Sequence, residues 1–266
     1  MRPEAEQTLP GHYTRIQAWK QHPLLAKPRQ WSFDVRSLLA REPLWWPLFQ
    51  VYIWWDQYNL RSRGHAAPEE RVVGPSTEIV IDGYPGSANS FATAAFRQSQ
   101  RQPVRMAHHL HAPVQIRRAV LRGIPTIVTI RDPRGAVLSL TSRWPHVTVR
   151  QGLRNYIHFY ERLQPLADRF VISTFARTTQ HFDRVVAEVN ARFGTHFDLF
   201  EPTEENLRAL RRPEKFQTEA WKQRQAWKKR KARDFEKDEV QRLLQRAEAI
   251  HAWYEERAGA FDAMDP

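Results

Sequence analysis

A loop of small and turn-forming residues follows the apolar run 78–82. The loop reads Gly83-Tyr84-Pro85-Gly86-Ser87-Ala88-Asn89-Ser90 and leads into a segment of helical character. Small residues allow backbone N–H groups to converge on an anion, and the next helix adds the positive end of its dipole. The order of strand, loop and helix therefore predicts a phosphate-binding site. An ordinary turn that caps a helix through Ser87 or Asn89 is the alternative.

The loop departs from the phosphate loops of nucleoside triphosphatases at one decisive position. Their two glycines, lysine and hydroxyl correspond to Gly83, Ala88, Asn89 and Ser90. The lysine is the cation that such enzymes place on the β and γ phosphates, and asparagine carries no charge. We therefore expect a ligand with a shorter phosphate chain, and a kinase of this type is disfavoured.

A second pair of candidate anion-binding side chains follows the apolar run 126–130. Arg131 comes directly after it, Pro133 suits the first turn of a helix, and Ser139 lies two turns along that helix. A guanidinium can make a forked contact to a phosphate, and the hydroxyl can bind the same group. The sequence thus predicts two separated anion sites. In the structural alternative, Arg131 pairs with neighbouring charges and Ser139 is a small packing residue.

Three histidines, His108, His109 and His111, lie at the end of the apolar run 104–108. Imidazole has an unperturbed pKa near neutrality, so it can accept a proton from a hydroxyl group at neutral pH. A metal site needs three converging ligands, whereas His108 and His109 are expected to point to opposite faces of an extended chain. The histidines therefore indicate a general base or a structural role, and we expect no metal.

Short β-rich runs alternate with helical segments from residue 78 onward. We expect strands at 78–82, 104–108, 126–130 and 170–173, and helices at 91–99, 114–122, 135–142, 150–168 and 178–193. The alternation is typical of βαβ units and predicts an α/β fold, a three-layer P-loop-like arrangement around a mostly parallel central sheet. Right-handed crossovers bring the loops at the carboxyl ends of the strands to one edge, where such sheets bind ligands.

The composition divides the chain into three parts. We expect a helical, aromatic-rich N-terminal extension over residues 1–75, a nucleotide-binding α/β core over 76–200, and a charged helical segment over 201–266 that packs on the core. Segment 43–60 holds four of the ten tryptophans, yet it is too short and too polar to span a bilayer. It is expected to pack on the domain or to lie at a membrane surface. Segment 214–258 predicts a long helix or a helix pair.

The charge balance of the chain limits its partners. The 266 residues include 41 Lys and Arg against 29 Asp and Glu, a formal net charge of +12. This charge favours anionic ligands or anionic lipid surfaces, and we do not expect nucleic acid to be a partner. No cysteine occurs, which excludes disulfides, thiol nucleophiles and thiolate metal sites. The polar N-terminus lacks the apolar stretch of a secretion signal, so we expect a cytoplasmic protein, with peripheral membrane contact left open.

The two anion-binding segments together resemble the sulfotransferase family. The run from Tyr84 to Phe91 is similar to that family's 5′-phosphosulfate loop, usually Y-P-K/R-S-G-T/N-T/S-W/F, and the run from Arg131 to Ser139 is similar to its 3′-phosphate motif. The resemblance implies that the chain binds 3′-phosphoadenosine 5′-phosphosulfate and releases adenosine 3′,5′-bisphosphate, without a metal. The implied nucleotide-binding residues are Tyr84, Pro85, Gly86, Ser87, Ala88, Asn89, Ser90, Phe91, Arg131 and Ser139.

The resemblance also implies a general base. In the family a histidine after the second strand has this role, and His109 is the closest match by position, with His108 as its neighbour. The base would remove the proton of a hydroxyl or amine acceptor as the acceptor attacks sulfur. Carbohydrates, lipids, small molecules such as phenols, and peptides all remain open as acceptors, because variable loops hold the acceptor in this family.

One departure from the family affects the expected chemistry. Gly86 stands where the family usually has a lysine or arginine that stabilises the bridging oxygen of the leaving phosphate. The charge would have to come from elsewhere, and the candidates are Arg105, Arg134 and the basic segment 228–233. The second hypothesis is therefore a catalytically impaired nucleotide-binding protein of the same fold with a regulatory or scaffold role. Gly86→Lys is expected to raise turnover if the loop tolerates a side chain.

Overall fold

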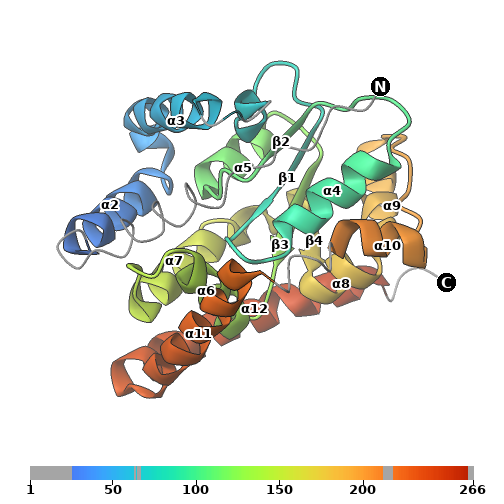
Figure 1. Ribbon diagram of the computed structural model, residues 1–266. Helices are drawn as coiled ribbons and strands as arrows, with labels where there is room; N and C mark the ends of the chain where they lie inside the picture. Colours follow the sequence, from blue (N-terminus) through green and yellow to red (C-terminus); the bar gives the residue numbers. More distant parts are fainter. Residues whose placement is uncertain (1–25, 63, 65–66, 212–217, 263–266) are drawn as a thin grey trace.

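The computed structural model describes residues 26–62, 64, 67–211 and 218–262. In this part of the chain a sheet of four parallel strands has the order β2-β1-β3-β4 (Figure 1). The strands are β1 (Ile79–Gly83), β2 (Met106–His108), β3 (Thr126–Ile130) and β4 (Val171–Thr174). The predicted parallel sheet is confirmed, and the strand bounds differ from the expected ones by at most two residues.

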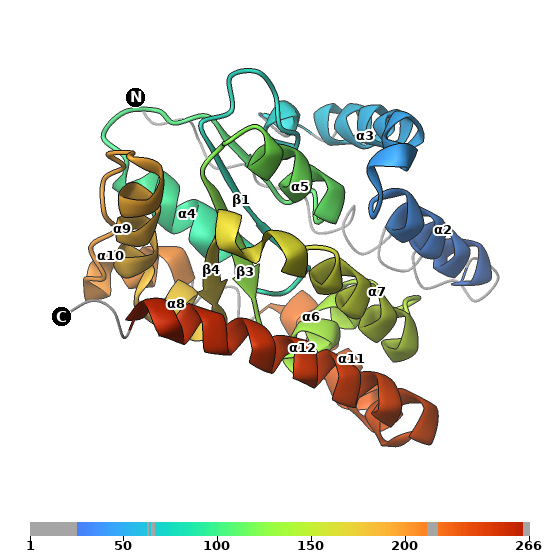
Figure 2. The same ribbon diagram turned by 180° about the vertical axis from the view of Figure 1, so that it is seen from behind.

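Helices cover both faces of the sheet because the strand side chains alternate between the faces. Ile79 and Ile81 of β1 pack with α4 (Asn89–Ser99) and α9 (Phe182–Phe193). Val80, between them, packs on the other face with α5 (Pro113–Leu121). Apolar residues on both faces are what a parallel sheet covered by helices requires. Figures 1 and 2 show these layers from opposite sides.

Two predicted helix lengths are wrong. The helix expected over 150–168 is α7 (Val149–Glu161), and Pro165 lies in the first turn of the 3-10 helix η4 (Gln164–Arg169) that follows it. Proline cannot donate the hydrogen bond that a continuing α-helix needs. The helix expected over 178–193 is divided at His181 into α8 (Phe175–Gln180) and α9.

The strand order creates a switch point between β1 and β3. After β1 the chain crosses to β2 on one side, and it then returns past β1 to place β3 on the other side. The carboxyl ends of β1 and β3 lie side by side, with Gly83 opposite Thr129. Open α/β sheets bind ligands at such a point, because the flanking loops diverge there and leave a crevice. The loop after β1 and α6 (Pro133–Arg143) after β3 border this crevice.

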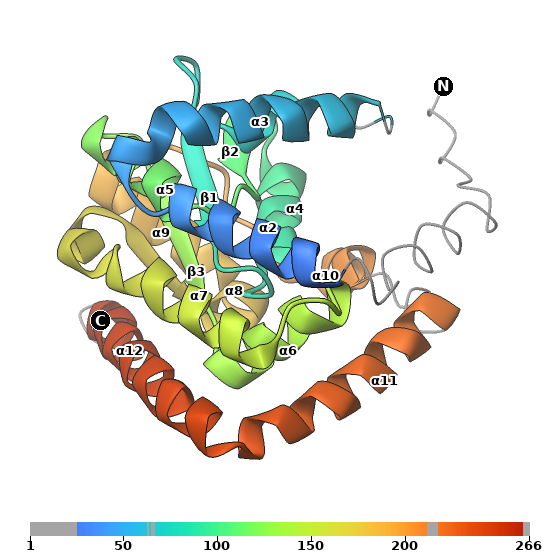
Figure 3. The ribbon, with the colours of Figure 1, turned by 90° about the vertical axis from the view of Figure 1, so that its left-hand side faces the viewer.

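Two N-terminal helices lie against this body, and Figure 3 views the molecule from their side. α2 (Ala26–Leu39) contributes Phe33 to the core. The 3-10 turn η2 (Pro43–Trp45) leads to α3 (Trp46–Arg61), which buries Phe49 and Ile53, and η3 (Pro68–Arg71) leads on to β1. The expected packing of 43–60 on the domain is confirmed for this one side of α3. No helix of the described residues is long and apolar enough to cross a membrane.

The C-terminal part forms a helix pair, one of the two arrangements expected over 214–258, although residues 214–217 lie outside the described part of the chain. After α10 (Glu204–Arg211), α11 (Glu219–Ala232) packs on α6, and α12 (Asp238–Asp262) packs on α7 and β4. The short turn η6 (Arg233–Glu236) joins the pair and buries Phe235. The Tyr254 hydroxyl of α12 donates to the carbonyl of Tyr160 at 2.9 Å. Both ends of the described chain therefore share one core with the sheet.

Candidate functional site

A pocket lies at the switch point, between the loop after β1 and α6. Its volume is about 180 Å³, which is below the ~300–1,000 Å³ of sites that enclose a drug-sized ligand. It suits an anionic group of a ligand whose remainder lies outside. The lining residues are Gly86, Ala88, Asn89, Ser90, His109, His111, Arg131, Ser139, Arg143 and Phe175. All of them except His111, Arg143 and Phe175 were expected from the sequence.

Unpaired backbone N–H groups line the start of α4. Ala88 is the N-cap residue of this helix, adopts the left-handed conformation with φ +68°, and makes no side-chain capping bond. The N–H groups of Ala88, Asn89 and Ser90 have no hydrogen-bond partner within the described part of the chain. Free donors and the helix dipole together favour an anion at this position.

Asn89 occupies the position of the lysine in the phosphate loops of nucleoside triphosphatases, and its side chain holds the loop in place. Its side-chain amide donates to the Tyr84 carbonyl at 3.0 Å and accepts from the Thr129 hydroxyl at 2.8 Å. The Tyr160 hydroxyl donates to the Thr129 carbonyl at 2.8 Å and accepts from the Tyr84 N–H at 3.3 Å. These bonds tie the loop to the end of β3, so the loop is held in shape before any ligand binds.

Four of the expected loop residues do not line the pocket. Tyr84, Pro85 and Ser87 are buried, and the Tyr84 hydroxyl donates to a backbone carbonyl of α7 at 2.9 Å. Phe91 packs edge-on against Phe200, with ring centres 6.4 Å apart. These side chains support the loop from behind.

Gly86 is a glycine for geometric reasons. Its φ is +94°, and a Cβ there would lie 2.8 Å from the Ser139 Cβ and 3.0 Å from the Ala136 carbonyl oxygen. Both the backbone angle and the crowding exclude a larger residue. The loop therefore does not tolerate a side chain at residue 86. For this reason we no longer expect Gly86→Lys to raise turnover.

Four cations gather beside the pocket, namely Arg131, Arg143, Arg224 and Lys228. Burial, followed by the charges of Arg224 and Arg131, lowers the pKa of Arg143 to about 10. Burial and the charges of the three arginines also lower the pKa of Lys228. The Nε atom of Arg224 is buried without a hydrogen-bond partner among the described residues. Mutual repulsion of this kind indicates a site that an anion would stabilise.

Arg131 belongs to this cluster, and Ser139 lines the same pocket. The Arg131 guanidinium lies 4.3 Å from the centre of the Phe175 ring and 3.3 Å from an Asp132 carboxylate oxygen. Arg143 donates to the Ser139 hydroxyl at 3.2 Å. In the described structure Asp132 is the only carboxylate that forms an ion pair with the four cations, so the cluster keeps a net positive charge.

The other cations proposed to replace the missing lysine lie elsewhere. Arg105 precedes β2 and pairs with Glu78 at 3.6 Å, at the amino edge of the sheet. Arg134 pairs with Glu236 at 3.9 Å and does not line the pocket. Neither can supply charge to the loop from there. Lys228, from the basic segment, is coupled to Arg131 and Arg143.

His109 lines the pocket, but both of its ring nitrogens are engaged. Nε2 lies 3.0 Å from the Ser90 hydroxyl and Nδ1 lies 2.7 Å from Nδ1 of His108. Burial, and then the charges of His111 and His108, lower the pKa of His109 to about 3. The ring is therefore neutral near pH 7 and a weak proton acceptor.

His111 is held by a buried carboxylate, and its second ring nitrogen has no hydrogen-bond partner among the residues that the structure describes. Its Nδ1 lies 2.8 Å from the Gly83 carbonyl oxygen and 3.1 Å from an Asp82 carboxylate oxygen. A carbonyl can only accept, so Nδ1 carries a hydrogen, and in the neutral form of the ring Nε2 carries the lone pair. Burial alone would raise the pKa of Asp82, but the charge and hydrogen bond of His111 outweigh it and lower that pKa. An imidazole oriented in this way by an ionised carboxylate is suited to accept a proton.

His108 points into a second, neighbouring cavity. This cavity has a volume of about 590 Å³ and is lined by Leu60, Ala67, Pro68, Glu70, Arg71, Arg97, His108 and His109. The expectation that His108 and His109 point to opposite faces is wrong, because His109 has φ +60° and the chain is not extended there. Their rings touch, and His109 forms a wall of both cavities. The residues that the structure describes include no group of three or more side chains suited to hold a metal ion.

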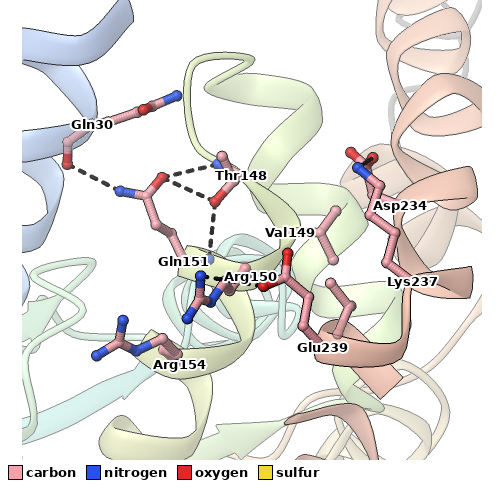
Figure 4. A pocket seen from close by; sticks show the side chains of 10 residues that line it. Gln30, Thr148, Val149, Arg150, Gln151, Arg154, Asp234, Lys237 and Glu239 are labelled. Carbon is pink, nitrogen blue, oxygen red and sulfur yellow. Dashed lines mark hydrogen bonds and ion pairs between the residues drawn. The ribbon is translucent and has the colours of Figure 1, made fainter. Parts of the chain in front are cut away.

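A further cavity of about 350 Å³ lies between α2, the start of α7 and the η6–α12 junction (Figure 4). Its polar side chains hold these elements together. Thr148 and Gln151 form the capping box of α7, and Gln151 also donates to the Gln30 carbonyl at 3.2 Å. Arg150 pairs with Glu239 at 3.3 Å. None of the site residues predicted from the sequence lines this cavity. Its polar side chains instead connect the helices that surround it.

No protein-family model, no curated protein and no solved structure matches the chain. The function must therefore be inferred from the geometry of the pocket and from the two sequence motifs.

Sequence reasoning missed the residues that reach the pocket through tertiary contacts. The pairing of Asp82 with His111 could have been predicted from the sequence, because a carboxylate inside an apolar strand needs a partner and the histidines follow the neighbouring strand. Arg143 and Arg224 had no comparable local signal. They are far apart in the chain, and the packing of α11 on α6 brings them together.

Proposed function

We propose that the chain is a sulfotransferase with a P-loop-like fold, which transfers a sulfuryl group from 3′-phosphoadenosine 5′-phosphosulfate to a hydroxyl or amine acceptor. The observation that carries the proposal is the switch-point pocket, where the unpaired N–H groups of α4 meet Arg131, Ser139 and Arg143. Two anion-binding features from different elements suit a nucleotide with anionic groups at both ends of its ribose. The two sequence motifs coincide with these features.

Each anionic group has its own set of donors in this proposal. The 5′-phosphosulfate binds at the start of α4, on the N–H groups of Ala88, Asn89 and Ser90. The 3′-phosphate binds to Arg131, the Ser139 hydroxyl and Arg143, and it relieves the repulsion among the clustered cations.

The transfer step involves one bond made and one bond broken at sulfur. The acceptor oxygen or nitrogen attacks sulfur, the bond from sulfur to the bridging phosphate oxygen breaks, and adenosine 3′,5′-bisphosphate leaves with the bonding electrons. The acceptor proton passes to an imidazole of the pocket. The N–H groups at the start of α4 and the Ser90 hydroxyl stabilise the charge that develops on the leaving oxygen, in place of the cation absent at Gly86.

The geometry favours His111 over His109 as the proton acceptor. His111 has an accepting Nε2 and a carboxylate that stabilises the protonated ring. His109 shares a hydrogen bond with Ser90, and burial holds its pKa at about 3. We therefore propose His111 as the base, and we propose that His109 positions Ser90.

The test of the nucleotide site is differential stabilisation. Adenosine 3′,5′-bisphosphate occupies both anion sites and should raise the melting temperature more than adenosine 5′-monophosphate does, since a ligand at a hundredfold excess over Kd adds about 2.7 kcal/mol. Arg131→Ala should abolish the difference, because a charge-assisted bond contributes about 1.5–3 kcal/mol. Arg134→Ala, which removes a nearby cation at the start of α6 that does not line the pocket, is the matched control. Equal shifts for the two nucleotides would refute the two-site assignment.

An assay of sulfate transfer distinguishes a sulfotransferase from a nucleotide-binding protein without activity. A panel of carbohydrate, lipid, phenol and peptide acceptors incubated with donor labelled in its sulfate group should yield a labelled product. Binding of adenosine 3′,5′-bisphosphate without transfer to any acceptor class would favour the nucleotide-binding protein with a regulatory or scaffold role.

A further inference from the structure

Large apolar side chains are concentrated on the outside of α2, η2 and α3. Trp54 and Trp55 are each 62% exposed, and Tyr58 is 70% exposed. The full set, called here the aromatic face, is Trp31, Leu38, Leu44, Trp45, Leu48, Val51, Trp54, Trp55 and Tyr58. The other exposed large apolar side chains of the described chain are Leu121 of α5, Phe175 at the switch-point pocket, and Leu199. An apolar patch of this extent marks an interaction site in a folded protein.

α3 is apolar on two opposite sides, and the fold uses one of them. Phe49 and Ile53 are buried against Leu110 and Val114. The outer side carries residues spaced by three or four positions, which form one stripe along a helix. They are Leu48, Val51, Trp55 and Tyr58, and Leu44 of η2 precedes them at the same spacing. Packing on the domain explains the inner side and leaves the outer stripe without a partner among the described residues.

Arginines border the aromatic face. The Arg118 guanidinium of α5 lies 4.0 Å from the centre of the Trp46 ring at the start of α3. Leu121, 58% exposed, and Arg122 follow one turn later on the same side of α5. Arg117, Arg118 and Arg122 form no ion pair within the described residues, so their charge is available to an external anion.

The acidic side chains of 26–61 are all engaged with the protein. Asp34 accepts from the Gln151 amide at 2.8 Å, Glu42 pairs with Arg162 at 2.6 Å, and Asp56 pairs with Arg71 at 3.4 Å. No carboxylate of this segment is therefore left to repel an anionic surface. The face combines exposed indoles, a phenol, aliphatic side chains and a basic border.

We propose that the aromatic face docks the protein on an anionic lipid surface. Tryptophan and tyrosine prefer the headgroup boundary, where the ring is in apolar contact and the N–H or O–H stays hydrated. The basic border of α5 then faces lipid phosphates, and the net charge of +12 draws the whole molecule to the surface. A second copy of the chain is a poorer partner, because it brings the same charge. This inference is independent of the proposed sulfotransferase activity.

Vesicle sedimentation with the full-length protein tests the proposal. The protein should bind vesicles of phosphatidylcholine mixed with phosphatidylglycerol, bind pure phosphatidylcholine vesicles much more weakly, and be released by high salt. Trp54→Ser combined with Trp55→Ser should weaken binding by at least about tenfold, because apolar contact with the bilayer is lost. Arg117→Gln and Arg122→Gln should each weaken binding by about fivefold. Leu199→Ser, at an exposed apolar residue outside the face, should have no effect.

Three outcomes would overturn the proposal. Absence of binding to the anionic vesicles is the first, and equal binding by the wild type and the double tryptophan variant is the second. The third is a concentration-dependent dimer that the double tryptophan variant abolishes, without vesicle binding, which would assign the face to a second copy of the chain. An unchanged melting temperature in each variant shows that loss of binding does not reflect misfolding.

Discussion

His109 and His111 line one pocket, yet their partners give them different chemistry. The ring of His109 is half-buried between Ser90 and His108, and both of its nitrogens are engaged, while its lowered pKa leaves it neutral. The ring of His111 is oriented by Asp82 through Nδ1. Both residues have positive φ values, +60° and +53°. Non-glycine residues are rarely held in this region, and they concentrate at functional sites.

His111→Asn should lower turnover by about 10²–10⁴, the usual contribution of a general base, and should leave nucleotide affinity nearly unchanged. His109→Asn should have the smaller effect. With a pKa held at about 3, His109 stays neutral between about pH 5 and 8, so its titration cannot produce a fall in wild-type turnover over that range. Single-turnover rates and nucleotide affinities of the two variants, measured with an acceptor from the panel, check this. A larger loss in His109→Asn would restore His109 as the base.

At the scale of elements, the loop between β1 and α4 is built by close packing against α6. Gly86 allows the loop to approach Ser139, which carries the predicted anion-binding hydroxyl. The same approach removes the room that a cationic side chain would need. The charge in this site therefore comes from Arg131 after β3, from side chains of α6 and α11, and from backbone donors at the start of α4, and not from a side chain of the loop.

Gly86→Ala should lower the free energy of unfolding by about 2–4 kcal/mol, because left-handed strain adds to overpacking against Ser139. Gly194→Ala is the matched control. Gly194 also has a positive φ, +64°, but a Cβ there would meet nothing within 4 Å. Gly194→Ala should therefore lower the free energy of unfolding by about 1–2 kcal/mol, through backbone strain alone. Urea unfolding of both variants measures the difference, and equal losses would show that contact with Ser139 does not restrict residue 86.

At the scale of the whole molecule, the C-terminal helix pair connects the switch-point pocket to the far side of the core. α12 packs on α7 and β4, while α11 returns over α6 and brings Arg224 and Lys228 to the cation cluster. A bound 3′-phosphate would join α11 to the sheet edge through opposite charges. The stability of α11 should therefore depend on the ligand.

Adenosine 3′,5′-bisphosphate at saturation should slow tryptic cleavage within α11 by at least about tenfold, because a ligand that binds only the closed state suppresses local opening. Adenosine 5′-monophosphate should protect less. Cleavage at Arg208 in α10, which packs on α4, is the internal control and should not change. Arg224→Gln combined with Lys228→Gln should remove the protection. Protection that persists in this double variant would show that α11 does not contact the nucleotide.

The sequence alone determined the parallel sheet, and it predicted that the two candidate anion-binding segments meet at one sheet edge. Continuous apolar runs such as 78–82 and 126–130 predict strands that are buried on both faces, as in a parallel sheet. In a parallel sheet the carboxyl ends of neighbouring strands lie at the same edge. Only the tertiary structure decided which histidine has a carboxylate partner, why residue 86 is glycine, and which cations reach the pocket. These features depend on contacts between residues such as Gly86 and Ser139, or Arg143 and Arg224. Local sequence patterns carry no information about such distances, because helix packing sets them.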